Sequence, residues 1–253
     1  MLNNKTNILI KTNKEISYMR EAGNIIAEIM NKLEKAVEPG ISTIELDNIC
    51  KKEIKNNNVK SAFLGLYDFP ATICVSINEE IVHGIPSKRR LKNGDIISID
   101  AGVIVSGFYS DHAKTFAVGD CAQKEINLLS DTLESLNLAI NMCVNGNFVG
   151  DIGSSVEKFI VPKGYGLVRN YTGHGFGRSL HEPPQVPNFG VPGTGAKLVP
   201  GMTLAIEPMV NIGKDETKLC DDGWTVVTSD GAKSAHFENT VLITDSKPEV
   251  LTS

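Results

Sequence analysis

The stretch from Gly94 to Val118, GDIISIDAGVIVSGFYSDHAKTFAV, is the most informative part of the sequence about the fold. Strand-forming residues lie on both sides of Ser106-Gly107, a pair that is typical of a two-residue hairpin turn. The turn would set the register of the two strands. We therefore expect an antiparallel hairpin in which Val105 faces Phe108.

This register brings two carboxylates together. Gly102 would face Asp111, and Asp100 would be a diagonal neighbour of Asp111 on the same face. Diagonal neighbours lie roughly 7–8 Å apart at Cα, so both side chains can reach one small cluster. Two carboxylates this close repel unless one is protonated or a cation lies between them. At this point a solvated sheet face remains the alternative. The opposite face suits a core, with Ile97, Ile99, Ala101 and Val103.

Two glutamates and one histidine elsewhere in the chain favour the metal hypothesis. Glu207 and Glu238 each lie inside an otherwise apolar strand, where a carboxylate is costly unless it is paired or binds a metal. Pro208 removes an N–H beside Glu207, which suits a strand end or a bulge next to a site. Glycines on both sides of His174 permit close backbone approach. With the two aspartates, these donors suit Mn(II), Fe(II), Co(II) or Zn(II), and four carboxylates favour two ions over one.

Helix signals lie before and after the hairpin. Capping boxes at Thr12-x-x-Glu15 and Ser42-x-x-Glu45 predict two helices, the first ended by Pro39-Gly40 and the second reaching about Ile54. Helical spacing predicts a third helix over about 124–144, and a shorter one that follows Asp151.

The remaining segments are strand-like or rich in glycine and proline. The predicted strands cover 72–77, 95–105, 109–118, 202–210, 225–228 and 236–244, and 172–200 is expected to form ordered loops. Helices and strand pairs come in runs with short turns between consecutive strands, so the predicted fold class is α+β with a mainly antiparallel sheet. No linker divides the chain, and a single catalytic domain over 1–253 is the simpler interpretation.

The composition is that of an ordinary soluble globular chain. Hydrophobic residues make up 41% and charged residues 22%, and the net charge of -5 argues against a nucleic-acid partner. The five cysteines are odd in number and widely spaced, which argues against a disulfide framework. No apolar run is long enough for a signal peptide or a membrane span, so we expect a cytoplasmic protein without a membrane partner.

A set of motifs, in this order along the chain, resembles the methionine aminopeptidases. The motifs are Tyr18-Met-Arg-Glu-Ala-Gly23, Pro39-Gly-Ile-Ser-Thr43, His83-Gly-Ile-Pro, Ile99-Asp-Ala-Gly, Gly107-Phe-Tyr-Ser-Asp111, Gly173-His-Gly-Phe-Gly-Arg, His181-Glu, Ile206-Glu-Pro-Met, Asp222-Gly-Trp-Thr225 and His236-Phe-Glu-Asn-Thr240. Only 26 positions separate His181 from Glu207, so the large helical insert of the second class is absent. The chain is most similar to a minimal bacterial type I enzyme.

The resemblance implies a fold and an activity. The fold would be the pita-bread fold, a pseudo-twofold antiparallel sheet flanked by helices around a dinuclear metal site. The activity would be removal of the initiator methionine from nascent proteins when the second residue is small. The implied partners are nascent polypeptide N-termini, with contact at the ribosome left open, and we expect a monomer.

The resemblance also implies roles for individual residues. Asp100 would bind the first metal ion, His174 and Glu207 the second, and Asp111 and Glu238 would bridge them. The two divalent ions would be Co, Mn, Fe or Zn. Glu207 would also act as the proton shuttle, and His83 and His181 would hydrogen-bond the substrate around the scissile amide. The methionine pocket would be lined by Phe63, Leu66, Tyr67, Phe69, Leu180 and Trp224, although Leu66 and Leu180 depart from some relatives and also suit an ordinary core.

Two alternatives remain at this stage. An X-Pro aminopeptidase or prolidase of the same fold would share the metal ligands, although those enzymes usually carry a large N-terminal domain. A non-enzymatic relative could use the fold as a binding module, but such relatives usually lose metal ligands, and all five stand here.

Overall fold

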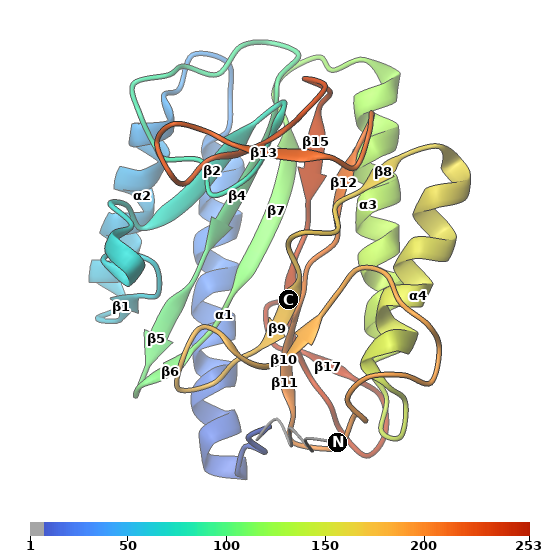
Figure 1. Ribbon diagram of the computed structural model, residues 1–253. Helices are drawn as coiled ribbons and strands as arrows, with labels where there is room; N and C mark the ends of the chain where they lie inside the picture. The colour runs from blue at the N-terminus through green and yellow to red at the C-terminus, as the bar shows by residue number, and fades with distance from the viewer. Residues whose placement is uncertain (1–7) are drawn as a thin grey trace.

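Within the part of the chain that the structure describes, four α-helices flank antiparallel strands that run through the middle of the molecule (Figure 1). The computed structural model describes residues 8–253. Helices α1 and α2 lie on one side of the strands, and α3 and α4 lie on the other. The helices are α1 (Asn13–Ala36), α2 (Thr43–Asn56), α3 (Gln123–Asn141) and α4 (Val149–Ile160), with short 3₁₀ turns at Leu66–Asp68 and Val161–Lys163.

All the strand pairs of the described residues are antiparallel, as predicted. The strands are β1 (Lys60–Ser61), β2 (Ile73–Ile77), β3 (Glu80–Val82), β4 (Ile96–Ala101), β5 (Val103–Val105), β6 (Phe108–Tyr109), β7 (His112–Ala117), β8 (Gly166–Leu167), β9 (Gly173–Gly175), β10 (Glu182–Val186), β11 (Thr203–Ile206), β12 (Met209–Asn211), β13 (Thr217–Leu219), β14 (Val226–Thr228), β15 (Ser234–His236), β16 (Asn239–Leu242) and β17 (Glu249–Val250). They form short sheets, of which β2-β4-β7, β15-β12-β8 and β10-β9-β11-β16-β17 surround the centre of the molecule.

The first two helices begin where the capping boxes predict. At α1, the Glu15 amide donates to the Thr12 hydroxyl, and the Glu15 carboxylate accepts from the Thr12 amide at 2.8 Å. The later helices differ by a few residues from the prediction. Helix α3 ends at Asn141 rather than near 144, and α4 begins at Val149, before Asp151. Asp151 lies inside the first turn of α4, where it accepts from the Phe148 amide at 2.7 Å.

The predicted hairpin has the predicted register. Val105 pairs with Phe108. The strand is interrupted at Gly102, between β4 and β5, and beyond this interruption Asp100 pairs with Ala113. A Cβ on Gly102 would lie 2.5 Å from the Ser110 carbonyl oxygen, so the backbone fills the space that a side chain would need. Glycine is therefore required where the strand passes the cluster.

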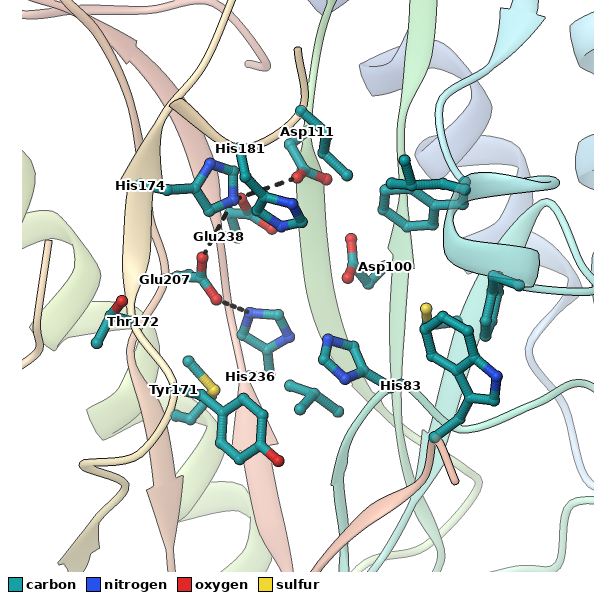
Figure 2. Close-up of a pocket in the computed structure, with 18 of the residues that line it drawn as sticks. His83, Asp100, Asp111, Tyr171, Thr172, His174, His181, Glu207, His236 and Glu238 are labelled. Atoms are coloured by element: carbon teal, nitrogen blue, oxygen red, sulfur yellow. Dashed lines mark ion pairs between the residues drawn. The ribbon is translucent and has the colours of Figure 1, made fainter. Parts of the chain in front are cut away.

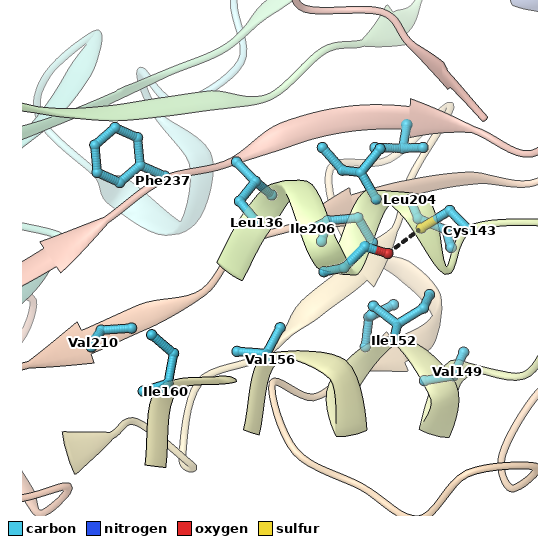
Figure 3. Close-up of a cluster of buried hydrophobic side chains, with 14 of the residues drawn as sticks. Leu136, Cys143, Val149, Ile152, Val156, Ile160, Leu204, Ile206, Val210 and Phe237 are labelled. Carbon is cyan, nitrogen blue, oxygen red and sulfur yellow. Dashed lines mark hydrogen bonds between the residues drawn. The ribbon is translucent and has the colours of Figure 1, made fainter. Parts of the chain in front are cut away.

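Two hydrophobic cores hold the helices against the strands. Ile97, Ile99, Ala101 and Val103 are fully buried under α1 and α2, as the alternation in the hairpin predicts. The second core lies between α3, α4 and strands β11 and β12, where Leu136, Ile152 and Leu204 pack together (Figure 3). Burial of each large side chain contributes about 1.5–3 kcal/mol, so both flanks of the central strands are firmly supported.

The prediction of loops over 172–200 is partly wrong, because this segment contains β9 and β10. Its glycines obscured the strand pattern. A Cβ on Gly173 would lie 2.3 Å from the Ala205 carbonyl oxygen, and one on Gly175 would lie 2.3 Å from that of Pro183. The glycines are thus required by close backbone contact inside the sheet rather than by loop flexibility.

Two predictions from the composition concern membrane-spanning helices and disulfides. Over 8–253, no helix is long and apolar enough to span a membrane. All five cysteines are free, in line with the expectation from their number and spacing.

Candidate metal centre

The long predicted strands are interrupted, and three of the four acidic residues lie at the interruptions. Segment 202–210 divides into β11 and β12 around Glu207, and segment 236–244 belongs to β15 and β16, which separate around Glu238. Asp111 lies between β6 and β7, and Asp100 lies near the end of β4. A break frees the backbone from ladder geometry and turns the side chain toward a common centre.

These residues surround a cavity of about 220 Å³ (Figure 2). Every residue that the sequence assigned to the site lines it. They are the ligands Asp100, Asp111, His174, Glu207 and Glu238, the histidines His83 and His181, and the pocket residues Phe63, Leu66, Tyr67, Phe69, Leu180 and Trp224.

Side chains fasten the backbones of Asp111 and Glu238 to each other. The Asp111 amide donates to the Thr240 hydroxyl at 3.2 Å, and this hydroxyl donates to the Asp111 carbonyl at 2.8 Å. The His112 ring lies 2.6 Å from the Glu238 carbonyl through Nδ1, which must donate because a carbonyl oxygen only accepts. Two carboxylates from distant parts of the chain are thereby held at a fixed spacing.

His174 faces the carboxylates through Nε2. This atom lies 3.9 Å from Oδ2 of Asp111 and 3.6 Å from Oε1 of Glu207. Ligand atoms of Asp111, His174 and Glu238 all lie within 4.8 Å of one another. Nδ1 of His174 donates to the Gly175 carbonyl at 3.0 Å, which leaves the lone pair of a neutral ring on Nε2 and directed at the cluster.

The electrostatics of the cluster fit a bound cation. Burial raises the pKa of Asp100 to about 7 and raises the pKa values of Asp111, Glu207 and Glu238 well above their usual range. Burial lowers the pKa of His174 to about 4, so its ring is neutral. The buried oxygens Oδ1 of Asp100, Oδ1 of Asp111 and Oε1 of Glu238 have no hydrogen-bond partner. Carboxylates with unused lone pairs at this spacing fit a site for divalent metal ions.

An apolar half of the cavity adjoins the acidic half. Phe63, Phe69 and Leu180 are buried there, and the Phe69 ring meets the Trp224 ring edge-on at 5.0 Å between centroids. Tyr67 differs from these residues because it is 70% exposed, and it stands on a left-handed backbone with φ of 50°. Tyr67 therefore lies at the rim of the cavity rather than in its wall.

The two histidines that the sequence assigned to substrate lie at opposite sides of the cluster. Burial lowers the pKa of both rings, and His181 further lowers the pKa of His83. The His181 ring lies 4.6 Å from the His174 ring, and the His83 ring meets the Tyr171 ring edge-on at 5.8 Å. At neutral pH both would act as neutral hydrogen-bonding groups.

Six further residues line the cavity and were not assigned to it from the sequence: Cys74, Val82, Tyr171, Thr172, Met209 and His236. Nε2 of His236 lies 3.7 Å from Oε2 of Glu207, so Glu207 lies between two imidazoles. Strand periodicity could have found two of the six. His236 lies two positions before Glu238, and Met209 two after Glu207, although the strand breaks weaken that signal.

Comparisons with known proteins agree with this geometry. Residues 17–245 match the model of metallopeptidase family M24. The chain is 50% identical over 246 residues to a methionine aminopeptidase of Clostridium acetobutylicum, and the match covers 97% of this chain and 98% of that protein. The crystal structure of a methionine aminopeptidase from Thermotoga maritima is similar with a TM-score of 0.96 and 42% identity, covering 97% of this chain and 99% of that one.

A prolidase-type structure is a more distant match. An Xaa-Pro dipeptidase from Bacillus anthracis is similar with a TM-score of 0.76 and 25% identity, and the match covers 97% of this chain but only 62% of that one. The shared fold confirms the predicted pita-bread architecture. The higher identity and mutual coverage favour the methionine aminopeptidases over the X-Pro alternative.

Proposed function

Because the chain belongs to metallopeptidase family M24, and within it to the methionine aminopeptidases, we propose that it removes the amino-terminal methionine of polypeptides whose second residue is small. The observation that carries this function is the juxtaposition of a buried carboxylate cluster with an apolar, aromatic-lined pocket. An unbranched thioether packs well against aromatic rings such as Phe69 and Trp224. The cluster then lies at the peptide bond that follows the bound side chain.

We further propose that Asp100, Asp111, His174, Glu207 and Glu238 would together hold two divalent ions. The four buried carboxylates support two ions, because their combined charge exceeds that of one divalent ion. The oxygen-rich ligand set fits Co, Mn, Fe or Zn. Such ions lower the pKa of a bound water and polarise a carbonyl oxygen.

The residues around the ions would divide the remaining work. Glu207, which lines the cavity beside the other carboxylates, accepts the proton of the attacking water and delivers it to the leaving amine. The neutral rings of His83 and His181 hydrogen-bond the scissile amide and stabilise the tetrahedral intermediate. The apolar pocket orients the methionine side chain and keeps water away from the reacting bond.

The cellular setting is also part of the proposal. Nascent polypeptide N-termini are the expected substrates, in the cytoplasm, and contact with the ribosome would bring enzyme and substrate together. We expect a monomer in which residues 1–253 form one catalytic domain. The shared cluster supports one domain, because Asp111 and Glu238 come from different halves of the chain and line a single site.

A peptide assay tests the function directly. With Mn(II), Fe(II) or Co(II) added, Met-Ala-Ser should be cleaved with a kcat/KM roughly 100-fold or more above that of X-Pro peptides, because X-Pro offers neither the thioether nor a secondary amide. Preference for X-Pro would instead indicate a prolidase. Absence of any peptidase activity with all three metals would favour a binding module.

His181→Ala should mainly reduce turnover. The ring lies at the cavity edge and donates to the substrate rather than to a metal, so kcat should fall roughly 10²-fold to 10³-fold while KM changes little. Metal content by elemental analysis should stay at the wild-type value. Loss of metal from this variant would show that His181 is a ligand.

A further inference from the structure

A buried ion pair connects the amino-terminal segment to the loop that carries His181. Nζ of Lys11 lies 2.8 Å from Oε2 of Glu182, and the two side chains are only 6% and 7% exposed. Their positions are 171 residues apart in the sequence. A buried pair of this kind is costly to break, because removal of one partner leaves an uncompensated charge.

The second oxygen of Glu182 organises the preceding turn. Oε1 accepts from the Arg178 amide at 2.8 Å and from the Ser179 amide at 3.1 Å. The carboxylate thereby closes the turn between β9 and β10, which brings Leu180 and His181 to the cavity. One carboxylate thus holds both Lys11 and the backbone of the turn.

Lys11 is itself fixed from the other side. Its amide donates to the Gly201 carbonyl at 2.9 Å, and its Nζ also donates to the Leu9 carbonyl at 3.1 Å. A Cβ on Gly177 would lie 2.4 Å from Cε of Lys11, so the lysine stem packs directly against the turn. The segment before α1 therefore supports the turn by packing as well as by charge.

The His181 ring depends on this support. Its ring contacts are aromatic, with the His174 ring at 4.6 Å and the ring of the exposed Tyr67 at 6.3 Å. The position of the imidazole therefore follows from the backbone of the turn.

We propose that Lys11 and Glu182 are positioning residues that hold His181 in reach of the scissile amide. The proposal rests on the function above, in which His181 hydrogen-bonds the substrate. A displacement of about 1 Å in such a group can cost about 100-fold in rate. The pair makes the amino-terminal segment a part of the active site, although it lies outside the cavity lining.

The test uses Lys11→Met and Glu182→Gln in the full chain loaded with Mn(II). Methionine keeps much of the lysine volume, and glutamine keeps an acceptor oxygen for the two amides. If one variant fails to fold, the other still tests the proposal. We expect kcat on Met-Ala-Ser to fall roughly 10-fold to 100-fold, with KM and Mn(II) stoichiometry by calorimetry unchanged. Lys32→Met and Glu53→Gln are the matched controls, because that pair is joined at 2.6 Å but lies at the surface with Lys32 53% exposed.

A double-mutant cycle separates positioning from general stability. In a His181→Ala background, Lys11→Met should reduce kcat by less than about 2-fold, because the group it positions is already absent. An undiminished loss in that background would overturn the proposal. The proposal would also be overturned if the wild type is active and Lys11→Met and Glu182→Gln cleave Met-Ala-Ser with the same kcat as the control variants. An inactive wild type would instead refute the proposed function and the inference with it.

Discussion

Glu207→Ala should reduce hydrolysis of Met-Ala-Ser about 10³-fold or more and leave the fold intact. The change removes both a proposed ligand and the group proposed to move the proton. It leaves the backbone undisturbed, because the Asn188 side chain donates to the Glu207 carbonyl at 2.9 Å and Pro208 fixes the next dihedral. The free energy of unfolding should not fall in the metal-free protein, since a buried carboxyl crowded by Asp111 and Asp100 is removed.

The measurement is kcat at saturating Mn(II), together with circular dichroism and the unfolding temperature. Glu207→Gln is the matched variant, because it keeps the size of the side chain and removes only its ability to take a proton and its charge. Both variants should be inactive. An active Glu207→Ala enzyme would remove Glu207 from the mechanism, and an active Glu207→Gln enzyme would show that its proton transfer is dispensable.

The sequence predicted the hairpin and the convergence of Asp100 and Asp111 well because the relevant physics is local. A two-residue turn at Ser106-Gly107 sets the register, and the register alone makes Asp100 and Asp111 diagonal neighbours. The capping boxes are equally local and were confirmed at α1 and α2. The ordered motifs, rather than any periodic pattern, predicted which residues of the second half of the chain converge on the site.

Features that depend on long-range contact could not be predicted in the same way. The strands β9 and β10 could not be predicted, because Gly173 and Gly175 have no side chains that would reveal a strand pattern. These glycines are required by backbone contact with distant residues. The break at Glu238 follows from a change of sheet that local propensity does not encode, whereas Pro208 is a local signal for the break at Glu207. The pair of Lys11 and Glu182 has no local signal, since its partners lie 171 residues apart in the sequence.

Removal of the metal ions with a chelator should abolish activity and reverse on addition of Mn(II). The unfolding temperature of the metal-free protein should also fall as the pH rises from about 6.5 to about 8. Burial raises the folded-state pKa of Asp100 to about 7, and those of Asp111, Glu207 and Glu238 lie well above their usual range. In this window the unfolded carboxyls are ionised while the folded cluster still holds protons. Stability contributed by these protons is complete below the unfolded pKa and is lost as pH rises through the folded values.

The histidines oppose this fall only at the lower edge of the window. Burial lowers the folded pKa of His112 and His174 to about 4 and that of His236 to about 3, so their contribution is lost as pH falls through the unfolded value of about 6.5 and is nearly complete at about pH 7.5. With Mn(II) at a fixed concentration of about 100 times its dissociation constant at pH 6.5, one bound ion adds about 2.7 kcal/mol at that pH, or roughly 5–10 °C for a chain of this size. Because metal binding displaces the protons, that increment should grow from pH 6.5 to pH 8. A metal-free unfolding temperature that rises over this window, or an increment that shrinks, would mean that the cluster does not hold its protons as a buried carboxylate group should.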